Sequence, residues 1–247
     1  MRIHSYLKSI GAAGVVACVL SSHAFGAVIV NGGFEAGFSG WSRADQLGSD
    51  GTFALQTGIV SPVNGDPVPS PSGPATAAMS DAQGPGAHAL YQDFTIPTPV
   101  AAGTMLTFDL FIGNRNTAFF SPATLDFSTP ALNQQARVDI LLAGTDPLSV
   151  GSSDVLLNVF QTNPGDPLVS GYATHSIDIT ALLNAHVGTA LRLRFAEVDN
   201  VAAFQLGVDQ VDIVTGAAAG VPEPASWLLA ASALALLSAR RRLGGRA

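Results

Sequence analysis

Short stretches in which apolar and polar residues alternate run through the middle of the chain. In the clearest of them, 106–112, every second residue is apolar, and Thr107 and Asp109 lie between them. A period of two places successive side chains on opposite faces of a β-strand. The same pattern recurs at 138–142 and at 191–195. It predicts strands that have one face in an apolar core and a polar face opposite, where Arg137, Asp139, Arg192 and Arg194 are placed.

Further segments have strand composition and lie between breaks rich in Asn, Gly, Asp and Pro. One helical turn is predicted at 181–187, with Thr180 as its N-cap. A long exposed loop is expected at 61–74, and a second loop at 114–133. Many short strands separated by such breaks predict an all-β sandwich. The further strand segments are 53–60, 89–96, 155–160, 172–179 and 205–214.

The last predicted strand changes phase part-way along. Leu206 and Val208 point to one face, whereas Val211 and Ile213 point to the other, as they would on either side of a β-bulge. Asp209 shares parity with the second pair, which would turn its carboxylate inward. A buried carboxylate needs partners, because an unpaired one is strongly disfavoured.

The charge of the chain is unevenly distributed. The whole chain carries a net charge of −7. The body, 28–220, has five arginines, no lysine and 17 carboxylates, a net charge of −12. A body this acidic is repelled by nucleic acid and by anionic membrane, and it is suited to divalent cations or to solubility outside the cell.

The N-terminus has the form of an export signal. Arg2 and Lys8 precede an apolar run at 10–20, and small residues follow between Ala24 and Ala27, where we expect cleavage by signal peptidase. The one cysteine of the chain, Cys18, lies inside the apolar run. Residues 1–27 are therefore predicted to be a signal peptide with a short helix, and the mature protein is predicted to lack cysteine.

The C-terminus combines a proline-rich motif, an apolar run and a basic end. The uncharged segment 225–239 has 15 residues, which as a helix would span about 22 Å against a hydrocarbon core of about 30 Å. Such a helix can insert into a membrane but is a marginal permanent anchor. The arginines that follow favour the cytoplasmic side, and the prolines keep the preceding backbone extended. A simple tail anchor is the alternative interpretation.

The residues of this tail resemble the PEP-CTERM sorting signal of Gram-negative bacteria. The resemblance covers 221–247 and implies processing near the Pro-Glu-Pro by an exosortase, a membrane-embedded cysteine transpeptidase, after transient anchoring in the inner membrane. It also implies a cell-surface or extracellular-matrix location in an exopolysaccharide or biofilm setting. The sorting motif comprises Val221, Pro222, Glu223, Pro224, Arg240, Arg241 and Arg242.

Between these ends, residues 28–215 are predicted to form one domain, followed by a linker at 216–220. The segments 31–35 and 208–211 resemble the opening and closing strands of galactose-binding-like jelly rolls. This resemblance implies a single jelly-roll β-sandwich. It also implies that Glu35 and Asp209 hold a structural calcium ion, for which they would have to be joined by other oxygen ligands. The alternative is that both carboxylates accept hydrogen bonds from turn amides.

Sugar recognition is the binding function that this fold most readily offers. Sugars stack on exposed aromatic rings beside polar groups. Tyr91 and Tyr172 are the candidate binding residues, whereas Trp41 is expected in the core. The sequence has no Gly-x-Ser-x-Gly, His-Glu-x-x-His, phosphate-loop or dinucleotide signature, so it predicts no enzyme.

The sequence thus predicts an exported, non-catalytic protein with a structural or adhesive role. A carbohydrate-binding, lectin-like protein is the alternative, with extracellular polysaccharide as its partner. A secreted hydrolase is a third hypothesis, which would require two carboxylates facing each other across a cleft.

Overall fold

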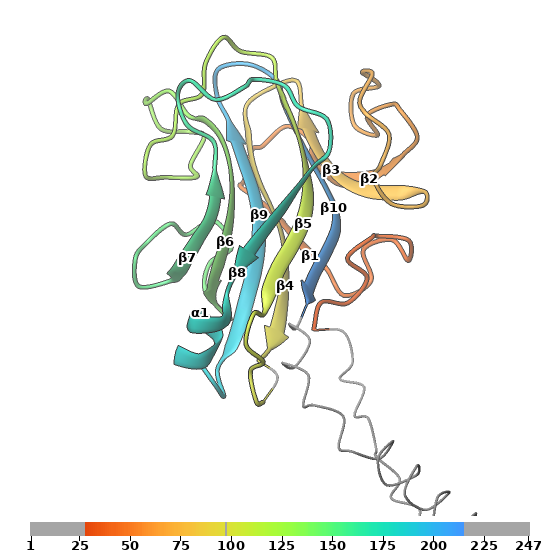
Figure 1. Ribbon diagram of the computed structural model, residues 1–247. Coiled ribbons are helices and arrows are strands. Elements are labelled where there is room, and N and C mark those ends of the chain that lie inside the picture. Colours follow the sequence, from red (N-terminus) through yellow and green to blue (C-terminus); the bar gives the residue numbers. More distant parts are fainter. Residues whose placement is uncertain (1–27, 97, 215–247) are drawn as a thin grey trace, which may run out of the picture.

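The computed structural model describes residues 28–96 and 98–214, which form two antiparallel sheets that face each other (Figure 1). In spatial order, sheet A contains β1 (Ser42–Asp45), β4 (Gly86–Thr95), β9 (Ala190–Asp199), β6 (Gln134–Leu142) and β7 (Val155–Gln161). Sheet B contains β2 (Thr52–Thr57), β3 (Thr76–Ala82), β10 (Phe204–Val214), β5 (Met105–Asn114) and β8 (Ala173–Asp178). A single short helix in this part of the chain, α1 (Thr180–Ala185), connects β8 to β9.

The path of the chain is that of a jelly roll. From β3 to β10 each connection crosses from one sheet to the other, apart from the β6–β7 turn within sheet A. β1 and β2 add one edge strand to each sheet. The predicted all-β jelly-roll sandwich is thus confirmed. The signal peptide, the linker, the sorting segment and both flanking helices lie outside the described residues.

The apolar face of each predicted strand packs between the sheets. Phe108 of β5 and Phe195 of β9 meet edge to face, with ring centroids 5.4 Å apart. Trp41 packs against Phe195 from the side of β1 and is only 7% exposed, so its predicted core position is confirmed. Replacing one of these buried phenylalanines with alanine typically costs about 3–5 kcal/mol.

The structure differs from the sequence predictions in its extra strands and in its loops. β1 and β3 were not predicted. The loop at 61–74 is not simply exposed, because Val68 is buried against Met79 and Phe111 on the outer face of sheet B. The N-cap of α1 is Ile179 rather than Thr180, since the Thr180 hydroxyl accepts a hydrogen bond from the Thr104 amide instead.

The predicted bulge in the last strand is present. The pairing of β10 with β5 shifts register between Asp209 and Asp212, and Gln210 has a positive φ of 49°. Asp209 is fully buried, but it pairs with Asp109 on the outer face of sheet B, under the loop that contains Ser72 and Gly73. The bulge therefore keeps this carboxylate out of the apolar core. The inward orientation, which was expected because Asp209 lies an even number of residues from Val211 and Ile213, is wrong.

Two loops cover much of the outer face of sheet A. The alanines of β4 and β9 on this face are fully buried beneath apolar side chains from the β5–β6 loop (115–133) and from the β6–β7 loop (143–154). We call these two segments the roof loops. Small side chains on the strands give the loops room to approach the sheet closely. The contact joins Ala87, Ala89, Ala196 and Val198 to Leu125, Phe127, Leu148 and Val150.

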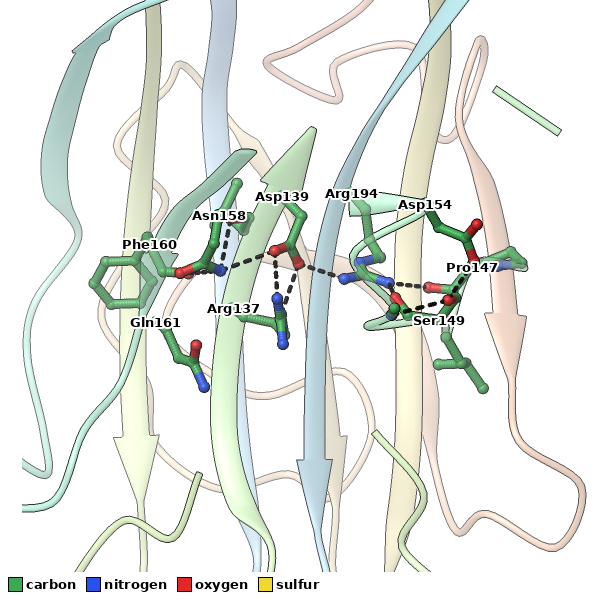
Figure 2. A network of polar contacts seen from close by, with 12 residues as sticks. Arg137, Asp139, Pro147, Ser149, Asp154, Asn158, Phe160, Gln161 and Arg194 are labelled. Carbon is green, nitrogen blue, oxygen red and sulfur yellow. Dashed lines mark hydrogen bonds and ion pairs between the residues drawn. The ribbon is translucent and has the colours of Figure 1, made fainter. Parts of the chain in front are cut away.

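A buried charge network holds the second roof loop in place (Figure 2). Asp139 accepts hydrogen bonds from Arg137 Nε and Nη2, at 2.8 and 2.7 Å, and from Arg194. Arg194 also donates to the carbonyl oxygens of Pro147 and Ser149, at 2.8 and 2.6 Å. The strand pattern placed these charged residues on a polar face, but Arg194 and Asp139 are completely buried.

The pairing of Asp139 with the two arginines stabilises the charged form of Asp139. Burial alone would raise the pKa of Asp139, but hydrogen bonds and charge from Arg137 and Arg194 outweigh burial and hold it below its usual range. A carboxyl group with a lowered folded-state pKa stabilises the fold above its unfolded pKa of about 3.9. This contribution is lost as the pH falls through the lower, folded pKa.

We expect Asp139→Asn to lower the free energy of unfolding of the full chain by about 3–5 kcal/mol at pH 7, because two buried guanidinium groups lose their counter-ion. The difference between wild type and variant should shrink as the pH falls below about 4. Urea unfolding at pH 7, 5 and 3 measures both effects. Asp212→Asn, an exposed carboxylate on β10, is the control. Equal losses in the two variants would contradict the stabilising role of the network.

Candidate functional site

An open groove runs along β1 at the edge of the sandwich. Its volume is about 780 Å³. The aromatic residues Phe38, Trp41 and Tyr91 contribute to it together with several polar side chains. We call it the β1 groove, and it is lined by Phe38, Trp41, Ser42, Arg43, Asp45, Gly51, Thr52 and Tyr91.

Pairing between β1 and β4 positions these side chains. Ser42 lies opposite Tyr91, on the outer face of sheet A. Arg43 faces the other way, and its Nη1 donates to the carbonyl oxygen of Phe53 in β2, at 2.7 Å. Thr52 donates from its hydroxyl to Asp45 Oδ2, at 3.0 Å. The groove therefore lies at the edge of the sandwich where side-chain hydrogen bonds join β1 of sheet A to β2 of sheet B.

The ring of Tyr91 is held by a charged neighbour. The guanidinium carbon of Arg192 lies 4.1 Å from the ring centroid, within the range of a cation–π contact. Arg192 is itself fixed, because Nε and Nη2 bind the Asp93 carboxylate at 2.6 and 3.0 Å. Its Nη1 donates to the carbonyl oxygen of Thr145 in the second roof loop, at 2.6 Å. Tyr91 is thus a half-buried ring of fixed orientation at the side of the groove.

Asp45 supplies the negative charge of the groove. Partial burial would raise its pKa, but the hydrogen bond and charge of His88, the Thr52 hydroxyl and the charge of Arg43 together lower it. His88 is fully buried and contacts Asp45 Oδ1 at 2.7 Å and the Asp50 carbonyl oxygen at 2.9 Å. At neutral pH Asp45 is ionised, so it can accept hydrogen bonds from a ligand but has no proton to donate.

Tyr172, the second candidate from the sequence, lies on the other sheet. Its hydroxyl donates to Gln56 Oε1, at 2.7 Å, and its ring packs against Phe111. The ring crosses Gly207 so closely that a Cβ there would lie 2.5 Å from the phenol oxygen. Burial and the charges of Asp209 and Asp109 raise the pKa of Tyr172. Tyr172 therefore packs within the outer layer of sheet B and does not join Tyr91.

Glu35 and Asp209 both fasten the segment that precedes β3. Glu35 Oε1 accepts hydrogen bonds from the amides of Ala75 and Thr76, which lower the pKa of Glu35. Asp209 accepts from Gly73 N at 2.7 Å, and also from the Ser72 hydroxyl and the Gln210 amide. These N–H donors suit a carboxylate that holds a turn better than one that binds a cation. The contacts fit the alternative prediction, in which both carboxylates accept hydrogen bonds from turn amides. Calcium at Glu35 and Asp209 stays a prediction.

Within the described part of the chain, no group of three or more His, Cys, Asp and Glu side chains is placed to hold a metal ion. Among the described residues that line the β1 groove, Asp45 is the only carboxylate. Asp109 and Asp209 are neighbours across sheet B, but they lie beside Tyr172 and under a loop rather than across a cleft. The geometry of the groove accordingly offers binding groups rather than an acid pair.

The sorting residues 221–224 and 240–242 lie outside the described residues. Among the residues that the structure describes, there is no helix with the length and hydrophobicity of a membrane span.

Sequence reasoning missed most of the groove. Arg43 and Asp45 were not singled out, because β1 is only four residues long and carries no apolar alternation. Thr52 opens β2 and lies just before the strand predicted at 53–60. Arg192 was assigned to the polar face of its strand without a partner. The Tyr91 position on a predicted strand was the one available signal, and the structure brings it together with these polar groups.

No protein-family model matches the chain, and no curated protein sequence matches it. Several solved structures are similar in fold. A carbohydrate-binding module of the β-sandwich superfamily with promiscuous specificity has 15% identity and a TM-score of 0.42, covering 73% of this chain and 60% of that one. The module CBM61 in complex with β-1,4-galactotriose has 12% identity and a TM-score of 0.44, covering 78% of this chain and 100% of that one.

A further similar structure is CBM28, a carbohydrate-binding module specific for non-crystalline cellulose. It has 13% identity and a TM-score of 0.43, covering 77% of this chain and 97% of that one. With identities and TM-scores this low, the likeness concerns the sandwich architecture alone. The likeness therefore says nothing about which ligand this chain binds.

Removing divalent cations tests the roles of Glu35 and Asp209. Because turn donors satisfy both carboxylates, we expect the melting temperature of the full chain to be the same with excess EDTA as with excess calcium. Asp209→Ala, which removes the anchor of Ser72 and Gly73, should lower the melting temperature equally in both conditions. A melting temperature that calcium raises in the wild type but not in Asp209→Ala would instead establish the calcium site.

Proposed function

We propose that this protein binds a glycan chain in the β1 groove and acts without catalysis at the cell surface or in the extracellular matrix. The observation that carries the proposal is the convergence, in one open groove, of a fixed tyrosine ring with hydroxyl, guanidinium and carboxylate groups. Apolar sugar faces stack on aromatic rings, while sugar hydroxyls need donors and acceptors beside them. Tyr91 supplies the ring, and Ser42, Arg43, Asp45 and Thr52 supply the polar groups.

The charges of the body favour a neutral glycan. The segment 28–220 carries a net charge of −12, and Asp45 in the groove is ionised at neutral pH. Arg43 and Arg192 already hold other groups, namely the Phe53 carbonyl and the Asp93 carboxylate. A polyanionic glycan would therefore meet repulsion without a free pair of cations to offset it. A glycan-binding groove would also give the protein the adhesive role that the sequence predicts.

Export and sorting belong to the same proposal. Residues 1–27 have the form of a signal peptide, and 221–247 resemble a PEP-CTERM signal that an exosortase would process. The start and the end of the described chain are joined, because the Val211 amide in β10 donates to the carbonyl oxygen of Gly32, in the turn region before β1, at 3.0 Å. The chain enters and leaves the sandwich at the same end (Figure 1), so a membrane attachment at either end would leave the rest of the sandwich free to bind.

A glycan array followed by calorimetry tests the binding proposal. We expect the full chain to enrich neutral glycans over uronic-acid or sulfated ones. Tyr91→Ala should weaken binding of the best glycan about tenfold through loss of ring stacking, whereas Tyr91→Phe should retain most of the affinity. Tyr172→Phe, which changes the tyrosine on sheet B, is the matched control and should bind as the wild type does.

Enrichment of no glycan would contradict the binding proposal and leave a structural role without sugar recognition. An affinity that falls in Tyr172→Phe and not in Tyr91→Ala would place the site on sheet B. Melting temperatures of the three variants separate lost binding from lost folding, since Tyr91→Ala also removes the contact with Arg192.

Intact-mass analysis of protein recovered from the cell surface tests the sorting proposal. We expect the recovered chain to begin between residues 25 and 28 and to end near 221–224 when a functional exosortase is present. Replacing Pro222 and Pro224 with alanine should leave the C-terminal segment attached. A complete C-terminal segment in the wild type, with and without exosortase, would contradict processing.

A further inference from the structure

The opposite edge of the sandwich contains a separate apolar cavity. It opens between β7 and β8, which are the edge strands of sheet A and sheet B. Its volume is about 280 Å³. An engineered cavity of about 150 Å³ is large enough to bind benzene in another protein. We call it the edge cavity, and its lining includes Leu110, Ile112, Phe160, Thr162, Ala173 and His175.

The interior of the edge cavity reaches the apolar core. Leu110 and Ile112 point between the sheets and are almost fully buried. The hydroxyl groups of the lining are already engaged. Ser170 Oγ accepts from the Ile112 amide at 3.0 Å, and Thr162 Oγ1 accepts from the Ala136 amide at 3.0 Å. An apolar ligand would gain by displacing water from such a surface.

One polar group of the lining has no hydrogen bond. The His175 imidazole stacks on Phe108, with centroids 5.2 Å apart and an interplanar angle of 16°, and meets Phe160 edge to face at 5.0 Å. These two rings fix its orientation. The ring nitrogens of His175 make no hydrogen bond to another residue within 28–96 and 98–214. Burial lowers the pKa of His175, which the charge of Asp109 opposes.

A neutral imidazole has one donor and one acceptor nitrogen, so it pairs well with a hydroxyl group. An acid is disfavoured, because the carboxylate of Asp166 lies at the mouth of the cavity and the body is strongly acidic. We propose that the edge cavity binds a small, neutral aromatic alcohol, with its ring in the apolar interior and its hydroxyl group bonded to His175. This site is distinct from the β1 groove and does not depend on glycan binding.

Histidine-selective NMR of the full chain, titrated with p-cresol, tests this proposal. We expect a saturable shift of the His175 signals. Toluene, which has the same shape without the hydroxyl group, should bind roughly fivefold more weakly, the factor that one hydrogen bond supplies. The p-toluate anion should not bind.

Two substitutions separate the parts of the site. His175→Phe keeps an aromatic ring against Phe108 but should abolish the preference for p-cresol over toluene, measured by calorimetry. Ala173→Leu places a larger side chain in the lining and should abolish binding of both ligands. Ser176→Leu, an exposed change on the same strand that does not line the cavity, is the matched control and should leave both affinities unchanged.

The proposal would be overturned if p-cresol gave no saturable shift up to its solubility limit. It would equally be overturned by an unchanged preference in His175→Phe or by full binding in Ala173→Leu. If the p-cresol shift disappeared as the protein concentration rises, a second copy of the chain would be covering the edge cavity. This result would also overturn the proposal.

Discussion

The pairing of Asp139 with Arg137 and Arg194 is the interaction on which the shape of sheet A depends. Three charges at the centre of a sheet face would normally remain in water, because an unpaired buried charge is very costly. Here Nη1 of Arg194 donates to the Pro147 and Ser149 carbonyls while Nη2 pairs with Asp139, so the side chain that neutralises Asp139 also fastens a roof loop. The charge network and the loop cover are therefore one structural unit.

This unit determines where sheet A can meet a ligand. The roof loops occupy the centre of its outer face, packing apolar side chains onto the alanines of β4 and β9. The edge at β1, where Tyr91 lies against Arg192, stays open. Because Arg192 also binds the start of the second roof loop through Thr145, the groove and the roof share a supporting residue. The opposite edge, at β7 and β8, contains the edge cavity.

The sequence predicted the fold wherever the side-chain pattern was strong. Alternation located β5, β6 and β9, and the phase change between Val208 and Val211 located the bulge in β10. β3 escaped prediction because its sequence, rich in alanine, has little strand propensity, although it pairs with two neighbours in sheet B. Burial of Arg194 and Asp139 could not be read from the strands, since it arises from the way the second roof loop folds over the outer face of sheet A. The groove was predictable only at Tyr91, because its other polar groups belong to short edge strands that are defined by tertiary contacts.

A glycan titration followed by amide NMR tests most directly the claim that the Asp139 network closes sheet A and confines binding to β1. The account predicts that a neutral glycan shifts the amide signals of 41–45 and of Tyr91, while the signals of Asp139, Arg194 and the roof residues 147–150 stay in place. Shifts centred on Asp139 and Arg194, with exchange broadening of the second roof loop, would show that this loop opens to admit the ligand and would contradict the account.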